Sequence, residues 1–391
     1  MTNLDEFSLG NERFFYCSQC LTTSLRPNAQ IDDGVCQPCT YSLGEENSDF
    51  RKQKIRLEKI VKDILSEPRF NSREYDCIIG VSGGKDSTRQ AIWVRDVLKL
   101  KVLLVCCSYP PEQMIETGAN NLANIIQLGF DLEVVNPAPL SAQKLSLESF
   151  LKFGNVCKAS EIALYTSVPQ LALEKNIPIC FFGENPALQE GDSATLGAHE
   201  FDANETRNLN TLTDGGINWI RETIGDRKFQ AYNYPTAKAF EDNGLQMLYL
   251  GPAWCDWDME ENALYSVLEG LITRPNETHI TGDLTNASML DEEFTNINMM
   301  IKYYKFGFGR ATDLCNELIR QGRMSREDAM EKVKKFDGIC SDETIDRYCQ
   351  WVGITAELFW EVVWSYTNPD IFLEGHPRPI ANFEVGIPLW G

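Results

Sequence analysis

YDCIIGVSGGKDS, the stretch from residue 75 to residue 87, decides the fold. Its first half is an apolar run typical of a buried strand, which we expect over 75–82, and a helix should begin near Asp86 and Ser87. Gly83 and Gly84 lie between them, and glycine lets a backbone approach phosphate closely. A helix N-terminus adds free N–H groups and partial positive charge. The stretch therefore predicts a phosphate-binding loop.

Short apolar runs alternate with helical patterns on both sides of this loop. Further strands are expected at 101–108, 131–136, 177–183 and 245–251, and the helices between them at about 87–100, 115–128, 140–151 and 160–176. Such alternation is typical of right-handed βαβ units, so we predict an α/β fold, a parallel sheet with helices on both faces. Ligands of such sheets bind at the carboxyl ends of the strands.

The pattern divides the chain into three parts. Residues 1–50 are poor in long apolar runs, 51–251 hold the predicted sheet after a linker helix at 51–66, and 252–391 are mainly helical. Helices are expected there at about 260–271, 292–306, 310–321, 325–336, 342–352 and 355–366. The polar segment 185–243 is too long for an ordinary connection, so we expect a functional loop such as a lid, or disorder.

Composition excludes several classes of protein. The 391 residues carry a net charge of −21, which repels a phosphate backbone, so nucleic acid is not expected as the main partner. No apolar run approaches the roughly 18 residues of a spanning helix, and the start MTNLDEFSLG is acidic where a signal peptide is basic and apolar. We therefore expect a cytoplasmic protein without a membrane span.

Four cysteines near the start form two pairs. The spacing Cys17-x2-Cys20-x15-Cys36-x2-Cys39 fits a closed, structural zinc site, whose metal supplies folding free energy to a short polar segment. An iron–sulfur cluster and four unrelated thiols are the alternatives. Cys157 lies near a predicted helix start, where a thiolate is favoured, although a core position is the other interpretation.

The phosphate loop is neither a Walker A loop nor a GxGxxG turn, since neither spacing occurs in it. Its order Ser-Gly-Gly-x-Asp-Ser resembles the PP-loop of the ATP pyrophosphatases, which cleave ATP between the α and β phosphates. A plain glycine-rich turn is the alternative. The resemblance implies that Lys85 offsets phosphate charge and that Asp86 holds Mg²⁺. The residues it assigns to ATP are Ser82, Gly83, Gly84, Lys85, Asp86 and Ser87.

Nearly the whole chain resembles the N-acetyl sugar amidotransferases, a PP-loop family of bacterial surface-polysaccharide and lipopolysaccharide O-antigen biosynthesis. The stretches that carry the resemblance are IDDGVCQPC (31–39), CIIGVSGGKDS (77–87), VCKASEIALYTSVPQLALEKNIPICFFGENP (156–186) and IKYYKFGFGRATDLCNELIRQGRMSREDAMEKVKKFDG (301–338).

That resemblance implies a reaction and its partners. ATP adenylates the acetamido oxygen of a nucleotide-linked N-acetyl sugar, ammonia replaces that oxygen, and an acetamidino sugar, AMP and pyrophosphate are released. The sequence has no glutaminase motif, so another chain is expected to deliver the ammonia. The resemblance implies that this source is a separate glutaminase and cyclase-like pair.

Further site residues follow from the resemblance. Gly183 and Ser108 would lie by ATP, and Glu184 would bind Mg²⁺ or position ammonia, the alternative being a surface carboxylate. Trp254 and Trp257 either stack on a ligand or belong to the core. The residues assigned to the sugar nucleotide are Asn185, Lys158, Lys302, Lys305 and Arg310; for the last three, a solvated basic helix end is the alternative.

Two other hypotheses compete. A PP-loop tRNA thiolase would need a basic face and a cysteine pair near the loop, whereas the chain is acidic and has Ser160 where relatives often carry a second cysteine after Cys157. A non-catalytic subunit would use the cysteine module and the helical tail for docking, but the intact Lys85 and Asp86 favour catalysis.

Overall fold

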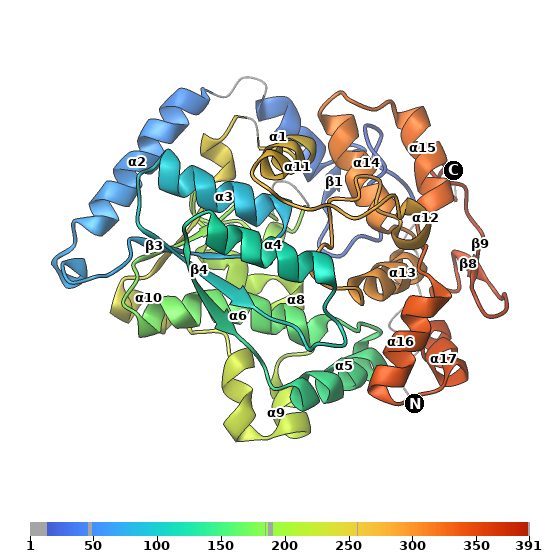
Figure 1. Ribbon diagram of the computed structural model, residues 1–391. Helices are drawn as coiled ribbons and strands as arrows, with labels where there is room; N and C mark the ends of the chain where they lie inside the picture. The colour runs from blue at the N-terminus through green and yellow to red at the C-terminus, as the bar shows by residue number, and fades with distance from the viewer. Residues whose placement is uncertain (1–13, 46–48, 184, 187–190, 256, 390–391) are drawn as a thin grey trace.

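A five-stranded parallel sheet forms the centre of the molecule in the computed structural model, which describes residues 14–45, 49–183, 185–186, 191–255 and 257–389 (Figure 1). The strand order is β5-β4-β3-β6-β7. The strands are β3 (Cys77–Gly80), β4 (Val102–Cys107), β5 (Asp131–Val135), β6 (Ile179–Phe182) and β7 (Gln246–Tyr249). The predicted α/β fold is confirmed.

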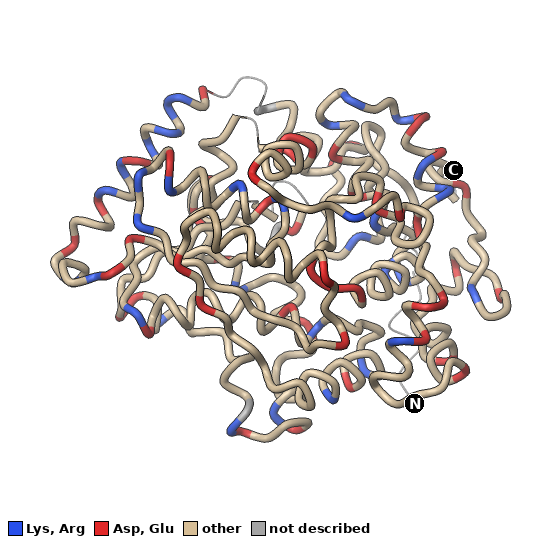
Figure 2. Tube along the Cα trace, viewed as in Figure 1, with Lys and Arg blue, Asp and Glu red and all other residues tan. Residues whose placement is uncertain are grey.

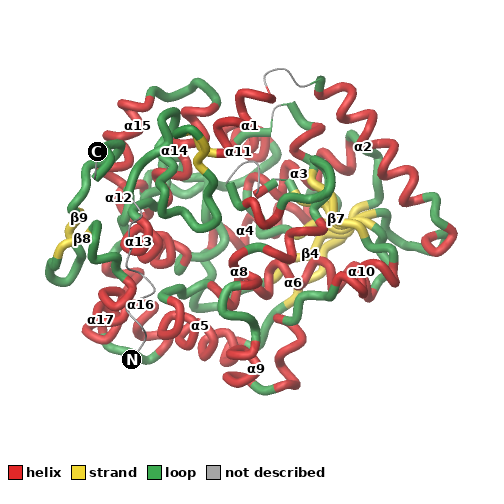
Figure 3. Tube along the Cα trace, turned by 180° about the vertical axis from the view of Figure 1, so that it is seen from behind, coloured by secondary structure: helices red, strands yellow, loops and turns green. Residues whose placement is uncertain are grey.

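Alternate side chains of the strands face two helical layers. Ile78 pairs with Leu103 of β4 and with Cys180 of β6, and packs with α6 (Lys158–Glu174) and α10 (Ala237–Asn243). Ile79 points to the opposite face, which is covered by α2 (Phe50–Leu65), α3 (Lys85–Asp96) and α4 (Glu116–Gln127). Seen from behind, α6 and α10 lie over the strands (Figure 3). Both faces of the sheet are therefore buried, as parallel sheets require.

The other helices lie on the chain where their capping residues predict. Ser325, Ser341 and Thr355 each accept a hydrogen bond from the third backbone N–H of the helix that follows, and Gly307 and Gly353 end helices in left-handed conformations. These helices are α1 (Gln37–Glu45), α5 (Pro139–Phe153), α8 (Asn210–Thr213), α9 (Asn218–Ile224), α11 (Met259–Leu268), α12 (Thr278–Thr281), α13 (Thr295–Phe306), α14 (Arg310–Arg320), α15 (Arg326–Phe336), α16 (Asp342–Val352) and α17 (Ala356–Tyr366). Two small hairpins are β1 (Ile31–Asp32) with β2 (Val35–Cys36), and β8 (Phe372–Leu373) with β9 (Ile380–Ala381).

The described part of 185–243, where a functional loop or disorder was expected, is a packed segment with short helices. It contains α8, α9 and α10, and the side chains of Trp219, Ile220, Phe229 and Tyr232 are buried against α5 and α6. Residue Asp202 also bridges Leu248 in antiparallel fashion at the edge of the sheet. Burial of these aromatic side chains stabilises short helices that their local sequence alone would not hold.

The described residues of the cysteine module share a core with the C-terminal helices. Phe14, Tyr16 and Leu21 belong to the same hydrophobic cluster as side chains of α13 to α17. The Leu21 N–H also donates to Asn316 Oδ1 of α14 at 2.7 Å. The blue N-terminal ribbon accordingly lies beside α14 and α15 (Figure 1). The two ends of the chain are thus joined on one side of the sheet.

Basic residues recur along α2, while acidic residues are spread over most of the molecule (Figure 2). Several cations of α2 have acidic neighbours, since Lys54 pairs with Glu58 at 3.7 Å and Arg56 pairs with Glu200. None of the helices that the structure describes has both the length and the apolar character needed to cross a membrane.

Glu292 is a buried carboxyl group that caps α13. Its Oε1 atom accepts from the Thr295 N–H at 2.7 Å, and its Oε2 atom accepts from the Phe294 N–H and from Gln113 Nε2, both at 2.7 Å. Burial, and after it the charge of Asp291, raise the pKa of Glu292 to about 7, although these hydrogen bonds act to lower it. The native state therefore holds a proton that the unfolded chain releases near pH 4.5.

We expect the Glu292→Gln variant to lose less stability than the wild type as pH rises. Between pH 4.5 and about 7 the native state binds the extra proton, so stability falls with rising pH, by on the order of 3 kcal/mol for this group. Glutamine keeps an acceptor for the α13 N–H groups but does not ionise. Urea denaturation at pH 5 and pH 8 measures the difference. Glu343→Gln on α16 is the control, and equal pH dependence in the wild type and Glu292→Gln would contradict the prediction.

Candidate active site

A cavity of about 480 Å³ lies at the carboxyl ends of the central strands. The phosphate loop follows β3, which pairs with β6. From β3 the chain adds β4 and β5 on one side of the sheet, and from β6 it adds β7 on the other side, so the direction of strand addition reverses between β3 and β6. This is the switch point at which such sheets bind ligands. All three parts of the chain line the cavity, through Arg26 and Ser42, Lys85 and Asp86, and helix α14. Its size suits a substrate-sized ligand.

The loop between β3 and α3 has the conformation that its glycines allow. Gly83 has a φ of +84°, and a Cβ atom there would lie 3.0 Å from the backbone nitrogen of Leu122. Helix α3 begins at Lys85, slightly earlier than expected, because Gly84 is already its N-cap. The Ser87 hydroxyl donates to the Gly84 carbonyl at 3.3 Å. The backbone of the loop therefore packs closely against α4 at Gly83.

Lys85 and Asp86 form an ion pair at this helix start. The Lys85 side chain is 6% exposed, and its Nζ atom lies 2.6 Å from Asp86 Oδ2. The other oxygen, Asp86 Oδ1, accepts from Asn262 Nδ2 of α11 at 2.7 Å, and the Ser266 hydroxyl donates to the Lys85 carbonyl at 2.7 Å. Arg89 donates in turn to Asn262 Oδ1 at 2.8 Å. Helix α11 thus orients the pair from outside the motif.

The residues after β6 form another part of the site. A Cβ atom on Gly183 would collide with the ring of Trp257, which lines the cavity, so only glycine fits there. Trp254 instead stacks on Trp93 with ring centroids 4.6 Å apart, within the core. Asn185 is buried and is not among the residues that line the cavity. Glu184 lies outside the described residues.

Another part of the cavity wall carries a cluster of charged groups on α14 and around it. Asp313 Oδ1 accepts from Arg26 Nη1 at 2.8 Å, and Asp313 Oδ2 accepts from Lys302 Nζ at 2.6 Å. Burial acts to raise the pKa of Asp313, but the charges of Lys302 and Arg26 outweigh burial and lower the pKa to about 2. Arg310, at the start of α14, lines the cavity beside them. The wall is therefore ionised at neutral pH.

The other predicted binding residues lie apart from this cavity. Lys158 Nζ lies 3.4 Å from Asp214 Oδ2, and Lys305 Nζ donates to the Phe153 carbonyl at 2.8 Å. Burial lowers the pKa of Lys305 to about 8, although the charge of Asp214 opposes this. Ser108 follows β4 and lines a second, much smaller cavity. The basic residues thus form two groups, and only one of them faces the main cavity.

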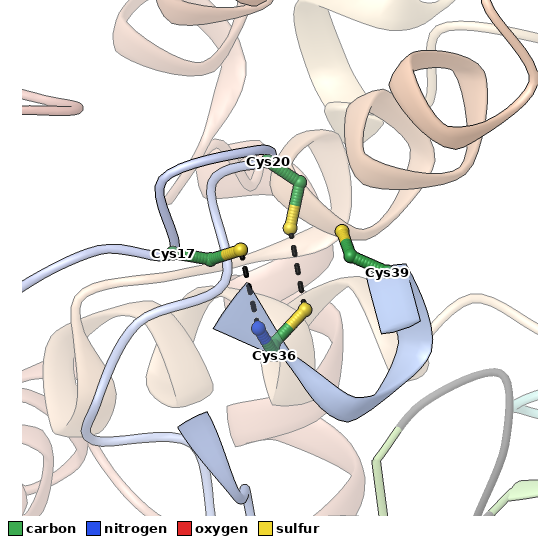
Figure 4. A group of neighbouring side chains, drawn as sticks. All are labelled: Cys17, Cys20, Cys36 and Cys39. Atoms are coloured by element: carbon green, nitrogen blue, oxygen red, sulfur yellow. Dashed lines mark hydrogen bonds between the residues drawn. The ribbon is translucent and has the colours of Figure 1, made fainter. Parts of the chain in front are cut away.

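The four cysteines of the N-terminal module converge, as Figure 4 shows. Their Sγ atoms all lie within 4.8 Å of one another, and those of Cys20 and Cys36 are 3.6 Å apart. A tetrahedral metal with bonds of about 2.3 Å to sulfur separates its ligands by about 3.8 Å. The N–H groups of Gln19 and Cys36 donate to Cys17 Sγ at 3.4 and 3.3 Å. This buried cluster can hold a metal, either zinc or iron.

Cys157 is a core residue in the structure. It precedes α6 as expected, but it is buried, and its Sγ atom lies 3.8 Å from Thr295 Oγ1. Burial raises the pKa of Cys157 well above its usual value, and the charges of Glu292 and Glu161 raise it further. Burial and nearby carboxylates therefore outweigh the helix start that favoured a thiolate.

Several cavity residues carried no signal in the sequence. Asn262 sits on an ordinary helix, Arg26 lies between the cysteine pairs, and Cys255 is an exposed thiol next to Trp254 in the sequence. Glu317 of α14 also lines it, and burial raises the pKa of this carboxyl group, with the charge of Asp86 adding to the effect. Only the packing of α11, α14 and the module onto the loop brings them together.

Comparison with known proteins locates one part of the chain. Residues 286–382 match a family described as LPS biosynthesis protein WbpG-like, C-terminal domain. The match spans α13 to α17, which is less than half of the chain. None of the curated proteins matches the chain significantly. The C-terminal helices are therefore similar to those of proteins that take part in lipopolysaccharide biosynthesis.

Two solved structures are similar to the chain at low scores. U34-tRNA thiolase NcsA from Methanococcus maripaludis with its 4Fe-4S cluster has a TM-score of 0.31 and 12% identity, over 77% of this chain and 87% of that one. NMN synthetase from Francisella tularensis has a TM-score of 0.27 and 15% identity, over 61% of this chain and 98% of that one. The fold assignment rests on the strand order and register described above.

Proposed function

We propose that the protein is an ATP-dependent amidotransferase of lipopolysaccharide biosynthesis. It adenylates the acetamido oxygen of a nucleotide-linked N-acetyl sugar and replaces that oxygen with ammonia-derived nitrogen. The observation that carries the proposal is the cavity itself, which is lined both by the Lys85–Asp86 pair and by the cationic group around Asp313. The match of residues 286–382 to an LPS biosynthesis family supports the sugar as second substrate.

ATP would lie along the loop after β3. In the proposed arrangement, Ser82, Gly83, Gly84 and Ser87 cradle its phosphates while Lys85 neutralises charge on the departing pyrophosphate. Asp86 fits Mg²⁺, since the ion is held by one or two carboxylates together with substrate phosphates and would neutralise their charge. Gly183 and Ser108 follow the two strands that flank β3 and remain proposed contacts of the nucleotide, although Ser108 lines the smaller cavity.

The reaction has two steps. The amide oxygen attacks the α-phosphorus, the bond to the β-phosphate oxygen breaks, and pyrophosphate leaves. Ammonia then attacks the activated carbon, a proton is lost from nitrogen, and AMP leaves with the former amide oxygen. Glu317 lines the cavity and its pKa is raised by burial, so we assign it the acceptance of that proton. Glu184, next to Gly183, is proposed to position ammonia or Mg²⁺.

The proposed binding site for the sugar nucleotide is assigned from which basic residues lie at the main cavity. Lys302 and Arg310 are proposed to face the sugar nucleotide, because Arg310 lines the cavity and Lys302 contacts Asp313, which also lines it. Lys158, Lys305 and Asn185 do not line the cavity, so this proposal gives them no direct contact with the sugar nucleotide.

Zinc is the metal that we propose for the cysteine cluster. Sulfur atoms within 4.8 Å of one another match the spacing around a single tetrahedral ion. A four-iron cluster binds each thiolate to a different iron and needs wider spacing. Separate glutaminase and cyclase-like subunits are the proposed source of ammonia.

Mass spectrometry tests the reaction. A panel of UDP- and CMP-linked acetamido sugars is incubated with the protein, Mg-ATP and ammonium, and AMP and pyrophosphate are followed in parallel. The proposal expects a product in which NH replaces oxygen, formed in step with AMP. AMP that appears only with tRNA and a sulfur donor would establish a thiolase instead. If no AMP forms with any of these substrates, the result would favour a non-catalytic docking subunit.

The Asn262→Ala variant should form AMP about 10- to 100-fold more slowly than the wild type. The substitution removes the hydrogen bond that orients Asp86 and leaves Arg89 without its 2.8 Å acceptor. Initial rates at saturating ATP measure the effect. Asn124→Ala, which removes a 2.9 Å hydrogen bond from α4 to the residue following α11, is the control and should change the rate less than threefold. Equal rates for the two variants would show that Asn262 does not position the pair.

A further inference from the structure

The cysteine module forms part of the cavity wall. The residues of this module that line the cavity are Thr22, Arg26, Pro38, Tyr41 and Ser42. Hydrogen bonds hold the module on the C-terminal helices, since Asn316 accepts from the Leu21 N–H at 2.7 Å and donates to the Thr22 hydroxyl at 3.2 Å. Arg326 also donates to the Cys20 carbonyl at 3.3 Å. The position of Arg26 therefore depends on both the module and α14.

This wall is locally positive in an acidic protein. Arg26, Lys302 and Arg310 surround one carboxylate, Asp313, and leave an excess of two positive charges. Counting Asp337, which accepts from the Gly309 and Thr312 N–H groups, still leaves one. Arg26 and Lys302 also lie 4.8 and 4.7 Å from the centre of the Phe308 ring, which fixes their positions.

Arg310 has bonding capacity that the described residues do not satisfy. Its Nε atom is buried and finds no hydrogen-bond partner among them. A buried, unpaired donor costs about 1–3 kcal/mol, and more on a charged group. Arg310 is half-buried and lines the cavity, where the exposed part of its guanidinium would form charge-assisted hydrogen bonds with an anionic ligand.

We propose that Arg26 and Arg310 form the subsite for the carrier phosphates of the second substrate, so that the cysteine module selects that substrate. The inference rests on the proposed function and adds an orientation. The carrier phosphates lie against α14, and the acetamido group points across the cavity to Lys85. Arg26 then links the metal module to substrate choice rather than to ATP.

Calorimetric titration of the full-length protein tests the subsite without turnover. UDP, CMP and inorganic pyrophosphate are titrated into protein saturated with Mg²⁺ and α,β-methylene-ATP, which fills the loop. We expect at least one probe to bind the wild type, and Arg26→Gln and Arg310→Gln to weaken it about tenfold or more. Arg310→Lys keeps the positive charge but not the forked guanidinium, so it should weaken binding of the probe less than Arg310→Gln does. Arg221→Gln on α9, an exposed arginine, is the control.

The outcomes separate this inference from the proposed reaction. An unchanged affinity of both arginine variants for α,β-methylene-ATP shows that they are folded. A probe that binds and depends on both arginines supports the subsite even if no acetamidino sugar is formed. Absence of binding by all three probes, or a change of less than twofold in both variants, overturns the subsite. If acetamidino sugar is formed but neither arginine variant changes the affinity for the probes, the proposed amidotransferase is supported and only the subsite is contradicted.

Discussion

Replacing Asp86 by asparagine should lower the rate of ATP-dependent AMP formation by about 10²- to 10³-fold. The carboxylate touches Lys85 Nζ at 2.6 Å and is the proposed ligand of Mg²⁺. Asparagine has the same shape and retains an acceptor for Asn262, but it removes the negative charge. Lys85 then lacks its ion-pair partner, and the metal lacks its protein carboxylate. AMP release measured by chromatography under saturating Mg-ATP checks the prediction.

The matched control for Asp86 lies on the same helix. Asp96 ends α3, is half exposed and pairs with Arg95 at 2.8 Å. Asp96→Asn makes the same chemical change away from the cavity, so its rate should stay within about twofold of the wild type. A rate for Asp86→Asn within threefold of the wild type would remove Asp86 from the proposed machinery. Unchanged melting temperatures would show that neither variant acts through folding.

Replacing Cys36 by serine should remove the bound metal and destabilise the whole chain. A structural zinc supplies folding free energy directly, and loss of one thiolate leaves three sulfur atoms that lie within 4.8 Å of one another. We expect metal content to fall from about one ion per chain to below a tenth of that. The melting temperature should fall by about 5 °C or more. Elemental analysis and calorimetry measure the two effects.

Cys340 offers the control for this substitution. It is as deeply buried as the cluster cysteines but belongs to the C-terminal hydrophobic core. Cys340→Ser carries the cost of a buried hydroxyl and should keep its metal. If Cys36→Ser retained a full complement of metal, or if the wild type bound none after reconstitution, the cluster would be four neighbouring thiols. Elemental analysis of the wild type also distinguishes zinc from iron.

The fold was predictable because local signals agree with the topology. The helix expected over 342–352 is α16, which Ser341 caps and Gly353 ends. α13 begins at Thr295 rather than near 292, since the Glu292 side chain takes up the N–H groups of Phe294 and Thr295 and holds the preceding residues in a turn. Where a side chain accepts hydrogen bonds from N–H groups two or three residues later, the apolar periodicity of the sequence misplaces the first residue of the helix.

The segment 185–243 shows where periodicity fails altogether. Its α9 has seven residues and buries only Trp219 and Ile220, which is too little for a helical repeat. Phe229 and Tyr232 lie in a 3₁₀ turn and pack against the same core. The partners that stabilise these pieces are α5 and α6, and no local window of sequence contains them.

The candidate site could be predicted only where it is contiguous. The loop from Ser82 to Ser87 places its proposed chemistry in six consecutive residues, whereas Asn262 lies on a helix that packs on α3 and is 176 residues from Asp86. Arg26 reaches the cavity because the cysteine module rests on α14. A single asparagine or arginine has no pattern of its own, so only tertiary packing identifies it.

Leu21 and Asn316, which are in contact, lie 295 residues apart in the sequence. During synthesis the cysteine module is therefore made long before the helix on which it packs. At 5–20 residues per second, a ribosome needs roughly 15 to 60 s to make the intervening chain. The cysteines emerge at the beginning of that interval, and α14 emerges near its end. In the proposed zinc protein, the four thiols are therefore available to metal, and open to oxidation, before the helices that pack on their module have been made. The cavity closes only when the last third of the chain has left the ribosome.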